Sequence, residues 1–314
     1  MTGNYLEKGR KEMEYILETQ GITKVYGRKK VLDNVSIHVI QGDIYGLVGK
    51  NGAGKTTLMK IVSELANASS GSFAFFGRQN GEIRDLAWRR GILIENPGIY
   101  PEYSGERNLR LKCMAYGVKD KTEPKRLLSM VGLGNVNSRA VKKYSFGMKQ
   151  RLGIAMAMVG NPDLIILDEP INGLDPQGIS EVRDMIKKVN KETGATFIIS
   201  SHILEELSKI ATRYGIIHNG KLLEEITSEE LEERCSTKVE LITDNAAAAA
   251  TVLESAGISD YKVLDNGVIY IYDANDRTAD ITEMMVTAGL KVYEITKKQD
   301  SFENYFINLI GKEA

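Results

Sequence analysis

A glycine-rich loop at residues 49–56 constrains the fold of this chain more than any other feature. Its sequence, Gly-Lys-Asn-Gly-Ala-Gly-Lys-Thr, matches the phosphate-binding P-loop. The apolar residues 44–48 before it predict a short buried strand, and residues 57–62 after it predict the start of a helix. An incidental lysine in a glycine-rich turn is the alternative, but the full motif in this strand–turn–helix setting indicates binding of a nucleoside triphosphate.

The residue types of this loop suit phosphate chemistry. Glycine lets the backbone wrap closely around phosphate oxygens, and the amide groups of the turn and of the helix N-terminus point toward the anion. Lys55 can reach the β- and γ-phosphates, and the Thr56 hydroxyl can bind Mg²⁺. The predicted phosphate-binding residues are Gly49, Asn51, Gly52, Ala53, Gly54, Lys55, Thr56 and Thr57.

Length, charge and hydropathy limit the class of protein. The 314 residues have room for about two domains, and a net charge of −1 gives no global field that would attract nucleic acid. The two cysteines and three histidines are scattered, which argues against a disulfide framework or a structural zinc site. Residues 1–14 lack the apolar core of a secretory signal, so we expect a flexible leader, with Met13 as an alternative start to Met1. No run of 18 apolar residues occurs, so a cytoplasmic location without a membrane span is expected.

Strand and helix patterns alternate between residues 15 and 225, which predicts an α/β domain with a parallel sheet. The predicted strands are residues 16–23, 35–40, 44–48, 72–76, 92–95, 164–167, 196–200 and 215–218. The predicted helices include 106–116 capped by Ser104, 124–131 capped by Thr122, and a long helix that opens at Asp175-Pro176 and ends near Gly194.

The pattern changes after Glu225, and residues 226–314 predict a second domain. A linker helix at 228–234 is followed by a strand at 238–242, a helix at 246–256, a hairpin at 261–272, a helix at 281–288 and a strand at 291–296. This β-α-β-β-α-β order predicts a ferredoxin-like α+β fold, followed by a last helix at 302–310 capped by Ser301. Its role stays open between regulation, dimer contact and cover for apolar surface.

Asp168 and Glu169 follow the apolar strand at 164–167. A carboxylate at the end of such a strand can bind Mg²⁺, and the next one can polarise the water that attacks the γ-phosphate. Two loop carboxylates without a function are the alternative, which is weak because a P-loop site needs a metal-binding acid from a neighbouring strand.

Further motifs follow in order at residues 144–151 (Tyr-Ser-Phe-Gly-Met-Lys-Gln-Arg), 173–176 (Gly-Leu-Asp-Pro) and 200–202 (Ser-Ser-His). With them, the chain resembles the nucleotide-binding subunits of ATP-binding cassette (ABC) transporters from about residue 15 to residue 225. The resemblance implies a P-loop NTPase fold of ABC type, with a parallel-sheet core, an antiparallel β subdomain and a helical subdomain. It also implies an ATPase coupled to transport.

The resemblance further implies roles for single residues. Tyr26 matches the aromatic residue that stacks on adenine. Ser145 and Gly147 match the signature motif, which contacts the γ-phosphate of ATP held by a second subunit. Asp175 matches an acid at the dimer contact, and His202 matches the histidine that senses the γ-phosphate and orients the water. Because one chain carries one P-loop and one signature, the expected partner is a second copy in a head-to-tail, ATP-dependent dimer.

Two departures from the family pattern stand out. The signature is usually Leu-Ser-Gly-Gly-Gln, whereas residues 144–148 here are Tyr-Ser-Phe-Gly-Met. Glu95 stands where the family has a glutamine that touches Mg²⁺ and the transmembrane partner. A carboxylate can bind Mg²⁺ more strongly than an amide, but it adds negative charge near the γ-phosphate. Glu95 and the residues after it resemble the bacitracin-export and lantibiotic self-protection branch.

The predicted function is the ATP-hydrolysing subunit of an exporter of peptide antibiotics or similar amphiphilic compounds, held at the inner face of the membrane by a permease. The predicted catalytic residues are Lys55, Glu169 and His202, and the predicted Mg²⁺ ligands are Thr56, Glu95 and Asp168. A soluble ABC ATPase is one alternative, although such proteins commonly carry two cassettes or a long coiled-coil insertion. A nucleotide-sensing module without hydrolysis is the other, and the intact catalytic set argues against it.

Overall fold

The computed structural model describes residues 15–79, 82–136, 138–235, 237–274, 276–299 and 301–311. The chain divides into two compact units, one that ends at Ser228 and one that begins at Glu229. The expected leader, residues 1–14, lies outside the described residues.

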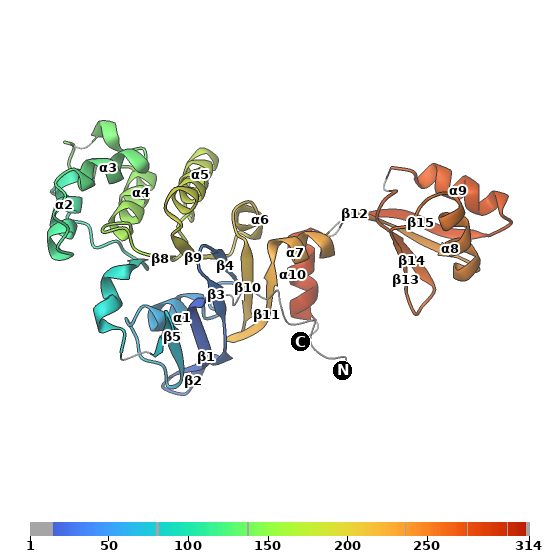
Figure 1. Cartoon of the computed structure of the whole chain (residues 1–314), viewed down its shortest axis with the longest axis horizontal. Coiled ribbons are helices and arrows are strands. Elements are labelled where there is room, and N and C mark those ends of the chain that lie inside the picture. The colour runs from blue at the N-terminus through green and yellow to red at the C-terminus, as the bar shows by residue number, and fades with distance from the viewer. Residues whose placement is uncertain are drawn as a thin grey trace, which may run out of the picture. The chain divides into compact units, whose positions relative to one another are not determined.

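A six-stranded sheet forms the centre of the N-terminal unit (Figure 1), with the strand order β11-β10-β4-β9-β8-β7. The strands from β10 to β7 run parallel, and β11 pairs antiparallel with β10. Every residue of β4 and β8 is buried, as expected for central strands that are covered on both faces. The strands are β4 (Ile44–Val48), β7 (Arg90–Leu93), β8 (Leu164–Leu167), β9 (Thr196–Ser201), β10 (Arg213–His218) and β11 (Lys221–Thr227).

A second, antiparallel sheet has the order β2-β1-β5-β6, and β3 also pairs with β1. Helix α1 (Lys55–Val62) joins the two sheets, because its Leu58 and Met59 share one core with Phe75 of this sheet and Leu164 of β8. The strands are β1 (Tyr15–Tyr26), β2 (Lys29–Val35), β3 (His38–Ile40), β5 (Ser70–Phe75) and β6 (Arg78–Gln79).

The prediction of one strand at 35–40 is wrong, because β2 ends at Val35 and β3 begins at His38. Side chains replace the ladder hydrogen bonds at this break. The Thr19 hydroxyl donates to the Val35 carbonyl at 3.1 Å and accepts from the Ile37 amide at 2.9 Å. Ser36 accepts from the Gly21 amide at 2.9 Å.

Helices α2 (Gly105–Ala115), α3 (Glu123–Met130) and α4 (Phe146–Ala157) pack on one another, and α4 also packs on β7 and β8. The Ser104 hydroxyl caps α2 by accepting from the Arg107 amide, as predicted. The predicted capping bond of Thr122 is wrong, since its hydroxyl donates to Asp120 at 2.7 Å instead. The remaining helices of this unit are α5 (Pro176–Thr193) and α6 (Leu204–Ser208), with 3₁₀ turns η1 (Arg84–Arg89), η2 (Gly134–Val136) and η3 (Val141–Lys143).

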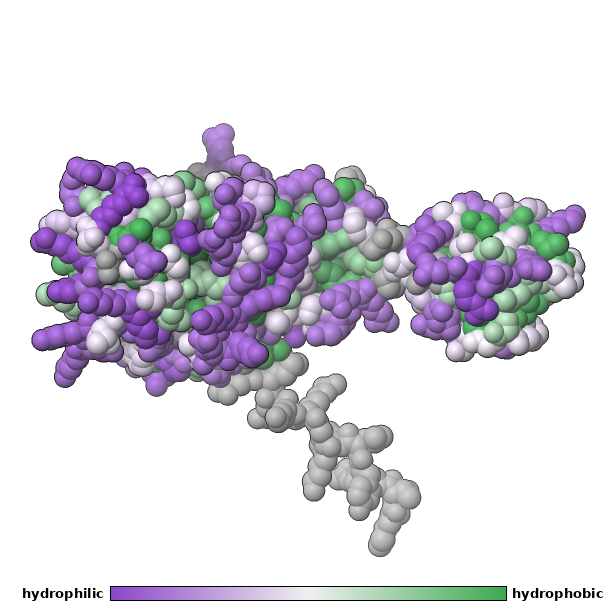
Figure 2. All heavy atoms as spheres, turned by 90° about the horizontal axis from the view of Figure 1, so that it is seen from above, coloured by the Kyte–Doolittle hydropathy of each residue, from purple (hydrophilic) through white to green (hydrophobic). Residues whose placement is uncertain are grey.

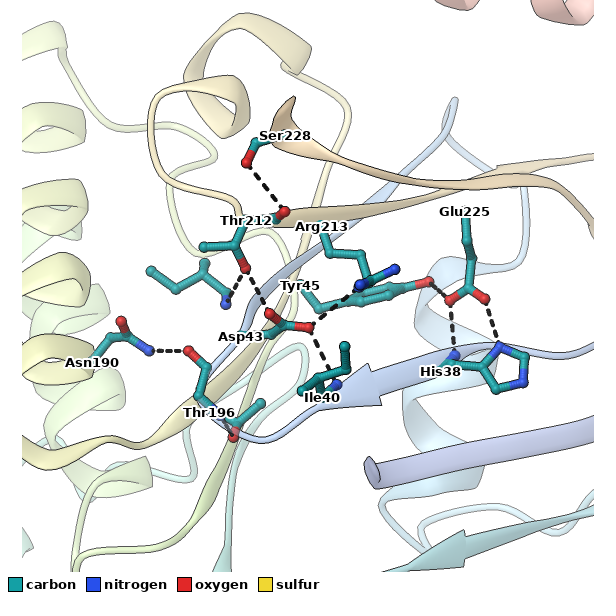
Figure 3. A network of polar contacts seen from close by, with 12 residues as sticks. His38, Ile40, Asp43, Tyr45, Asn190, Thr196, Thr212, Arg213, Glu225 and Ser228 are labelled. Carbon is teal, nitrogen blue, oxygen red and sulfur yellow. Dashed lines mark hydrogen bonds and ion pairs between the residues drawn. The ribbon is translucent and has the colours of Figure 1, made fainter. Parts of the chain in front are cut away.

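A polar network ties the amino ends of the parallel strands together (Figure 3). The Asp43 carboxylate accepts from the Thr212 hydroxyl at 3.0 Å, and the same hydroxyl accepts from the amide of Ile44, the first residue of β4. Glu225 of β11 accepts from the Tyr45 hydroxyl at 2.7 Å and contacts the ring Nδ1 of His38 at 2.7 Å. Burial raises the pKa of Tyr45 well above its usual value, so its hydroxyl stays a donor. The network fixes the edge of the sheet opposite to the P-loop.

The C-terminal unit holds a four-stranded antiparallel sheet with the order β13-β14-β12-β15. Val239 and Ile269 of the sheet form its core with Leu253 of α8 and Ile281 of α9. The hairpin at residues 261–272 is confirmed, and Gly267 takes the left-handed conformation that its turn requires (φ 82°). The elements are α7 (Ser228–Arg234), β12 (Thr237–Thr243), α8 (Ala246–Ser255), β13 (Tyr261–Val263), β14 (Val268–Ile271), α9 (Thr278–Thr287), β15 (Val292–Gln299) and α10 (Phe302–Gly311).

Apolar residues are scattered among hydrophilic ones over the face of the molecule drawn in Figure 2. The largest exposed fractions among the hydrophobic side chains include Met114 at 71% and Tyr293 at 66%. In the part of the chain that the structure describes, no helix is both long and apolar enough to cross a bilayer.

Candidate functional site

The carboxyl ends of four neighbouring parallel strands carry the predicted site residues. The P-loop follows β4, Asp168 and Glu169 follow β8, His202 follows β9, and Glu95 follows β7. These strands lie side by side in the order β4-β9-β8-β7. Because they run parallel, their carboxyl ends meet at one edge of the sheet (Figure 1). Ligands of open parallel sheets bind at this edge, so the topology gathers residues that are far apart in the sequence.

The P-loop turns sharply between β4 and α1, and glycine is required at two of its positions. A Cβ on Gly49 would lie 2.4 Å from the carbonyl oxygen of Ile217. Gly54 has φ 113° at the N-cap of α1, and its Cβ would lie 2.6 Å from Leu32. Asn51 is exposed at the tip of the loop, with Gly52.

Lys55 is buried beneath the loop, with 5% of its surface exposed. Its Nζ donates to the carbonyl oxygens of Gly49 at 2.6 Å and Lys50 at 3.4 Å. The same Nζ lies 3.2 Å from Oε1 of Glu169, which makes an ion pair without hydrogen-bond geometry. The ammonium is therefore held at the base of the P-loop, facing the carboxylate that the sequence predicts to activate water.

Ser200 links the carboxylate of Asp168 to the backbone of Glu169, a role that its place in the Ser-Ser-His motif does not reveal. Its buried hydroxyl donates to Oδ1 of Asp168 at 2.6 Å and accepts from the amide of Glu169 at 2.8 Å. The Thr56 hydroxyl donates to the other Asp168 oxygen at 2.8 Å. The ring Nδ1 of His202 lies 2.8 Å from Oε2 of Glu169. One chain of contacts thus runs from the P-loop helix to His202.

The backbone of Glu169 is strained, since its φ of 47° lies in the left-handed region that non-glycine residues rarely adopt. Such a conformation costs about 1–3 kcal/mol and persists only where neighbouring contacts hold it. The bonds to Ser200, His202 and Lys55 are those contacts. They fix the direction of the carboxylate.

The Thr56–Asp168 pair suits Mg²⁺. Hydroxyl and carboxylate oxygens are the ligands that Mg²⁺ prefers, and it is commonly held by one or two of them together with substrate phosphates and water. No cluster of three or more His, Cys, Asp or Glu side chains that could hold a metal occurs among the described residues. The pair offers one hydroxyl and one carboxylate oxygen, which leaves coordination positions for phosphate oxygens and water.

Glu95 lies beyond β7, which ends at Leu93, so the prediction of a strand at 92–95 is wrong at its carboxyl end. Its φ of 61° turns the chain out of the sheet, and its carboxylate pairs with Lys60 Nζ at 2.6 Å. A groove begins at Glu95 and continues to α4. It is lined by Glu95, Asn96, Pro97, Gly98, Ile99, Pro101, Val141, Phe146, Lys149 and Gln150.

Ser145, Gly147 and Asp175 line a second pocket. Ser145 caps α4 by accepting from the Met148 amide at 3.2 Å, and Asp175 caps α5 by accepting from the Gly178 amide at 3.1 Å. None of the described residues that line this pocket belongs to the P-loop. The pocket is lined by Ser145, Phe146, Gly147, Arg151, Gly173, Leu174, Asp175, Gln177, Gly178, Glu181 and Val182.

Tyr26 ends β1 and leaves 51% of its surface exposed. Lys24 Nζ lies 4.7 Å from the centre of its ring. An exposed aromatic face of this kind can stack on a base.

Comparison with known proteins agrees with this geometry. Residues 32–172 match the family model described as ABC transporter. The bacitracin transport ATP-binding protein BcrA of Enterococcus faecalis is 42% identical over 301 residues, which cover 95% of this chain and 97% of that protein. The lantibiotic transport ATP-binding protein SrtF of Streptococcus pyogenes is 44% identical, over 71% of this chain and 97% of that protein. A solved ATP-binding subunit of an ABC transporter is 29% identical, with a TM-score of 0.62 over 70% of this chain and 92% of that one.

Proposed function

The chain belongs to the ATP-binding subunits of ABC transporters, and from that membership we propose that it drives export of peptide antibiotics or similar amphiphilic compounds. The relatives named for bacitracin and lantibiotic transport support this cargo class. The bacitracin relative matches 95% of the chain, which includes most of the C-terminal unit that begins at Glu229. Bacitracin is therefore the first cargo to test.

The contacts of Glu169 are the main structural support for ATP hydrolysis by this chain. Its carboxylate, held by His202 and facing Lys55, can orient a water and accept its proton as the water attacks the γ-phosphate. Lys55 lies where it can neutralise charge on the β- and γ-phosphates, after exchanging its loop carbonyl contacts for phosphate oxygens. His202 holds the Glu169 carboxylate in a fixed orientation and can contact the γ-phosphate.

Mg²⁺ would be held by Thr56 and Asp168, with Glu95 within the same edge of the sheet. When bound, the ion would supply positive charge that offsets the charge developing on the transferred phosphate. The Thr56 hydroxyl would exchange its bond to Asp168 for the metal, and Ser200 would keep Asp168 in place through its other oxygen.

A second copy of the chain is the proposed partner for hydrolysis. The pocket of Ser145, Gly147 and Asp175 shares no described lining residue with the P-loop, which supports a site completed by another subunit. In a head-to-tail dimer, the signature pocket of one chain covers the ATP on the P-loop of the other, and two sites form by symmetry.

A permease is the proposed membrane partner, since the cargo must cross a bilayer and no described helix of this chain can span one. The chain then sits at the inner face of the membrane as a peripheral subunit. We propose residues 15–225 as the ATPase domain and residues 226–314 as a ferredoxin-like accessory domain. The antiparallel strand order β15-β12-β14-β13, with α8 and α9 packed into its core, supports the latter.

Glu169→Gln tests the proposed chemistry. An amide keeps the size of the side chain but cannot accept the proton, so steady-state ATPase activity should fall by about 10²–10³ while ATP binding persists. Glu192→Gln, on the exposed face of α5, is the matched control and should hydrolyse ATP at the wild-type rate. Near-normal turnover in Glu169→Gln would remove Glu169 from the mechanism. Loss of bacitracin tolerance in cells that carry the permease and the Glu169→Gln chain would test the cargo.

A further inference from the structure

Lys60 connects the helix after the P-loop with the unusual residue Glu95. It lies in the last turn of α1, and its Nζ donates to Oε1 of Glu95 at 2.6 Å. The lysine side chain is 31% exposed and the glutamate 64%. The hydrogen bond with Glu95 raises the pKa of Lys60, and the charges of Glu95, Tyr26 and Asp168 add to it. Lys60 therefore stays a cation beside Glu95.

Glu95 has two properties that call for a fixed cation. Its backbone takes a left-handed conformation that a non-glycine residue adopts only where contacts hold it (φ 61°). Its carboxylate also stands at the sheet edge that carries Asp168 and Glu169, so it adds negative charge where an anionic nucleotide would bind. An amide at this position would bring no such charge.

We propose that Lys60 is a positioning residue for Glu95. The Lys60 ammonium holds the Glu95 carboxylate on the loop after β7 and offsets the negative charge of that carboxylate beside the nucleotide. This inference rests on the proposed function, because the charge matters only if a nucleotide binds at this edge. It makes a specific demand: Lys60 is needed while residue 95 is a carboxylate and becomes dispensable when residue 95 is an amide.

The test compares the full-length wild type with Lys60→Met, Glu95→Gln and the double variant. Binding of a fluorescent ATP analogue is measured first without Mg²⁺, and KM and kcat for ATP are measured afterwards with Mg²⁺. Lys60→Met should weaken analogue binding about fivefold, the upper range for a solvent-exposed ion pair. The double variant should bind within about twofold of Glu95→Gln, and KM should follow the same order.

Lys60→Arg and Lys188→Met are the controls. Lys60→Arg keeps the charge, so this variant should bind the ATP analogue within about twofold of the wild type. Lys188 is an exposed lysine of α5 that lies 3.9 Å from Glu192. Unchanged binding in Lys60→Met would overturn the inference. An equal loss in the Glu95→Gln background would also overturn it, because Lys60 would then act on the nucleotide directly. A wild-type chain that binds no analogue would overturn the proposed function and the inference together, whereas the first two results overturn the inference alone.

Discussion

Ser200→Ala is expected to slow hydrolysis even though Ser200 touches no nucleotide in the proposed mechanism. The substitution deletes one hydroxyl and leaves Asp168, Glu169 and Lys55 in the sequence. What it removes is the bond that holds Asp168 at 2.6 Å and the acceptor that holds the amide of Glu169 at 2.8 Å. Glu169, with its φ of 47°, then loses the contact that fixes its backbone in the left-handed region.

The size of the effect follows from these two bonds. A hydrogen bond to a charged group is worth about 1.5–3 kcal/mol, and a neutral one about 1 kcal/mol. Their sum is about 2.5–4 kcal/mol, and each 1.36 kcal/mol that falls on the transition state lowers the rate about tenfold. If half of the loss appears as misdirection of Glu169, kcat should fall by about tenfold to thirtyfold, and the rest should appear as lower thermal stability.

Ser201→Ala is the matched control. Ser201 is equally buried, and its hydroxyl bonds only within its own turn, to the amide and carbonyl of Ile203 at 2.9 and 3.3 Å. Phosphate release should therefore give a kcat within about threefold of the wild type for Ser201→Ala, since its neutral bonds are worth about 1 kcal/mol each and involve neither Asp168 nor Glu169. Equal kcat values for the two alanine variants would refute the positioning role of Ser200.

Two further outcomes concern adenine stacking and core packing. Tyr26→Ala should raise the KM for ATP about tenfold, because stacking of a base on an aromatic ring is worth about 1–3 kcal/mol. Tyr26→Phe keeps the ring and should leave the KM unchanged. Equal KM values for the two variants, measured from initial rates, would exclude stacking. Gly91→Ala should lower the free energy of unfolding by about 3 kcal/mol in urea titrations, because the added methyl group would press on a neighbouring backbone segment and force that segment to shift. Its Cβ would lie 1.9 Å from the Ala157 carbonyl oxygen, whereas the nearest atom to that of the control Gly134→Ala would be Ser129 Oγ at 3.2 Å.

The sequence predicted those parts of the fold in which local pattern and tertiary environment agree. The strand before the P-loop is found at the predicted residues 44–48, because an apolar run of that length is what a central parallel strand requires. The caps by Ser104 and Ser145 and the turn at Gly267 also follow from local chemistry. Local signals of this kind need no knowledge of distant residues.

The elements that sequence reasoning missed depend on their neighbours in space. Strand β11 reads Lys-Leu-Leu-Glu-Glu-Ile-Thr, without clean alternation, and it forms because β10 offers a free antiparallel edge. The break between β2 and β3 depends on Thr19, which lies in another strand. No local pattern reveals such partners.

In the site, the motif residues could be named from the sequence, but their partners could not. The bond from Ser200 to Asp168 spans 32 residues, and the pair of Lys60 with Glu95 spans 35. The place of Glu169 after a strand marks it in the sequence, while its left-handed backbone is seen only in the structure.

In the proposed dimer, one chain's P-loop and another chain's signature complete each ATP site. Light scattering of the Glu169→Gln chain with MgATP, with MgADP and without nucleotide tests it most directly. A dimer is expected with MgATP alone, and a monomer with MgATP when Ser145→Arg is added, because the arginine would fill the pocket proposed to receive the partner's ATP. A dimer of equal strength with MgADP, or one that survives Ser145→Arg, would contradict the claim.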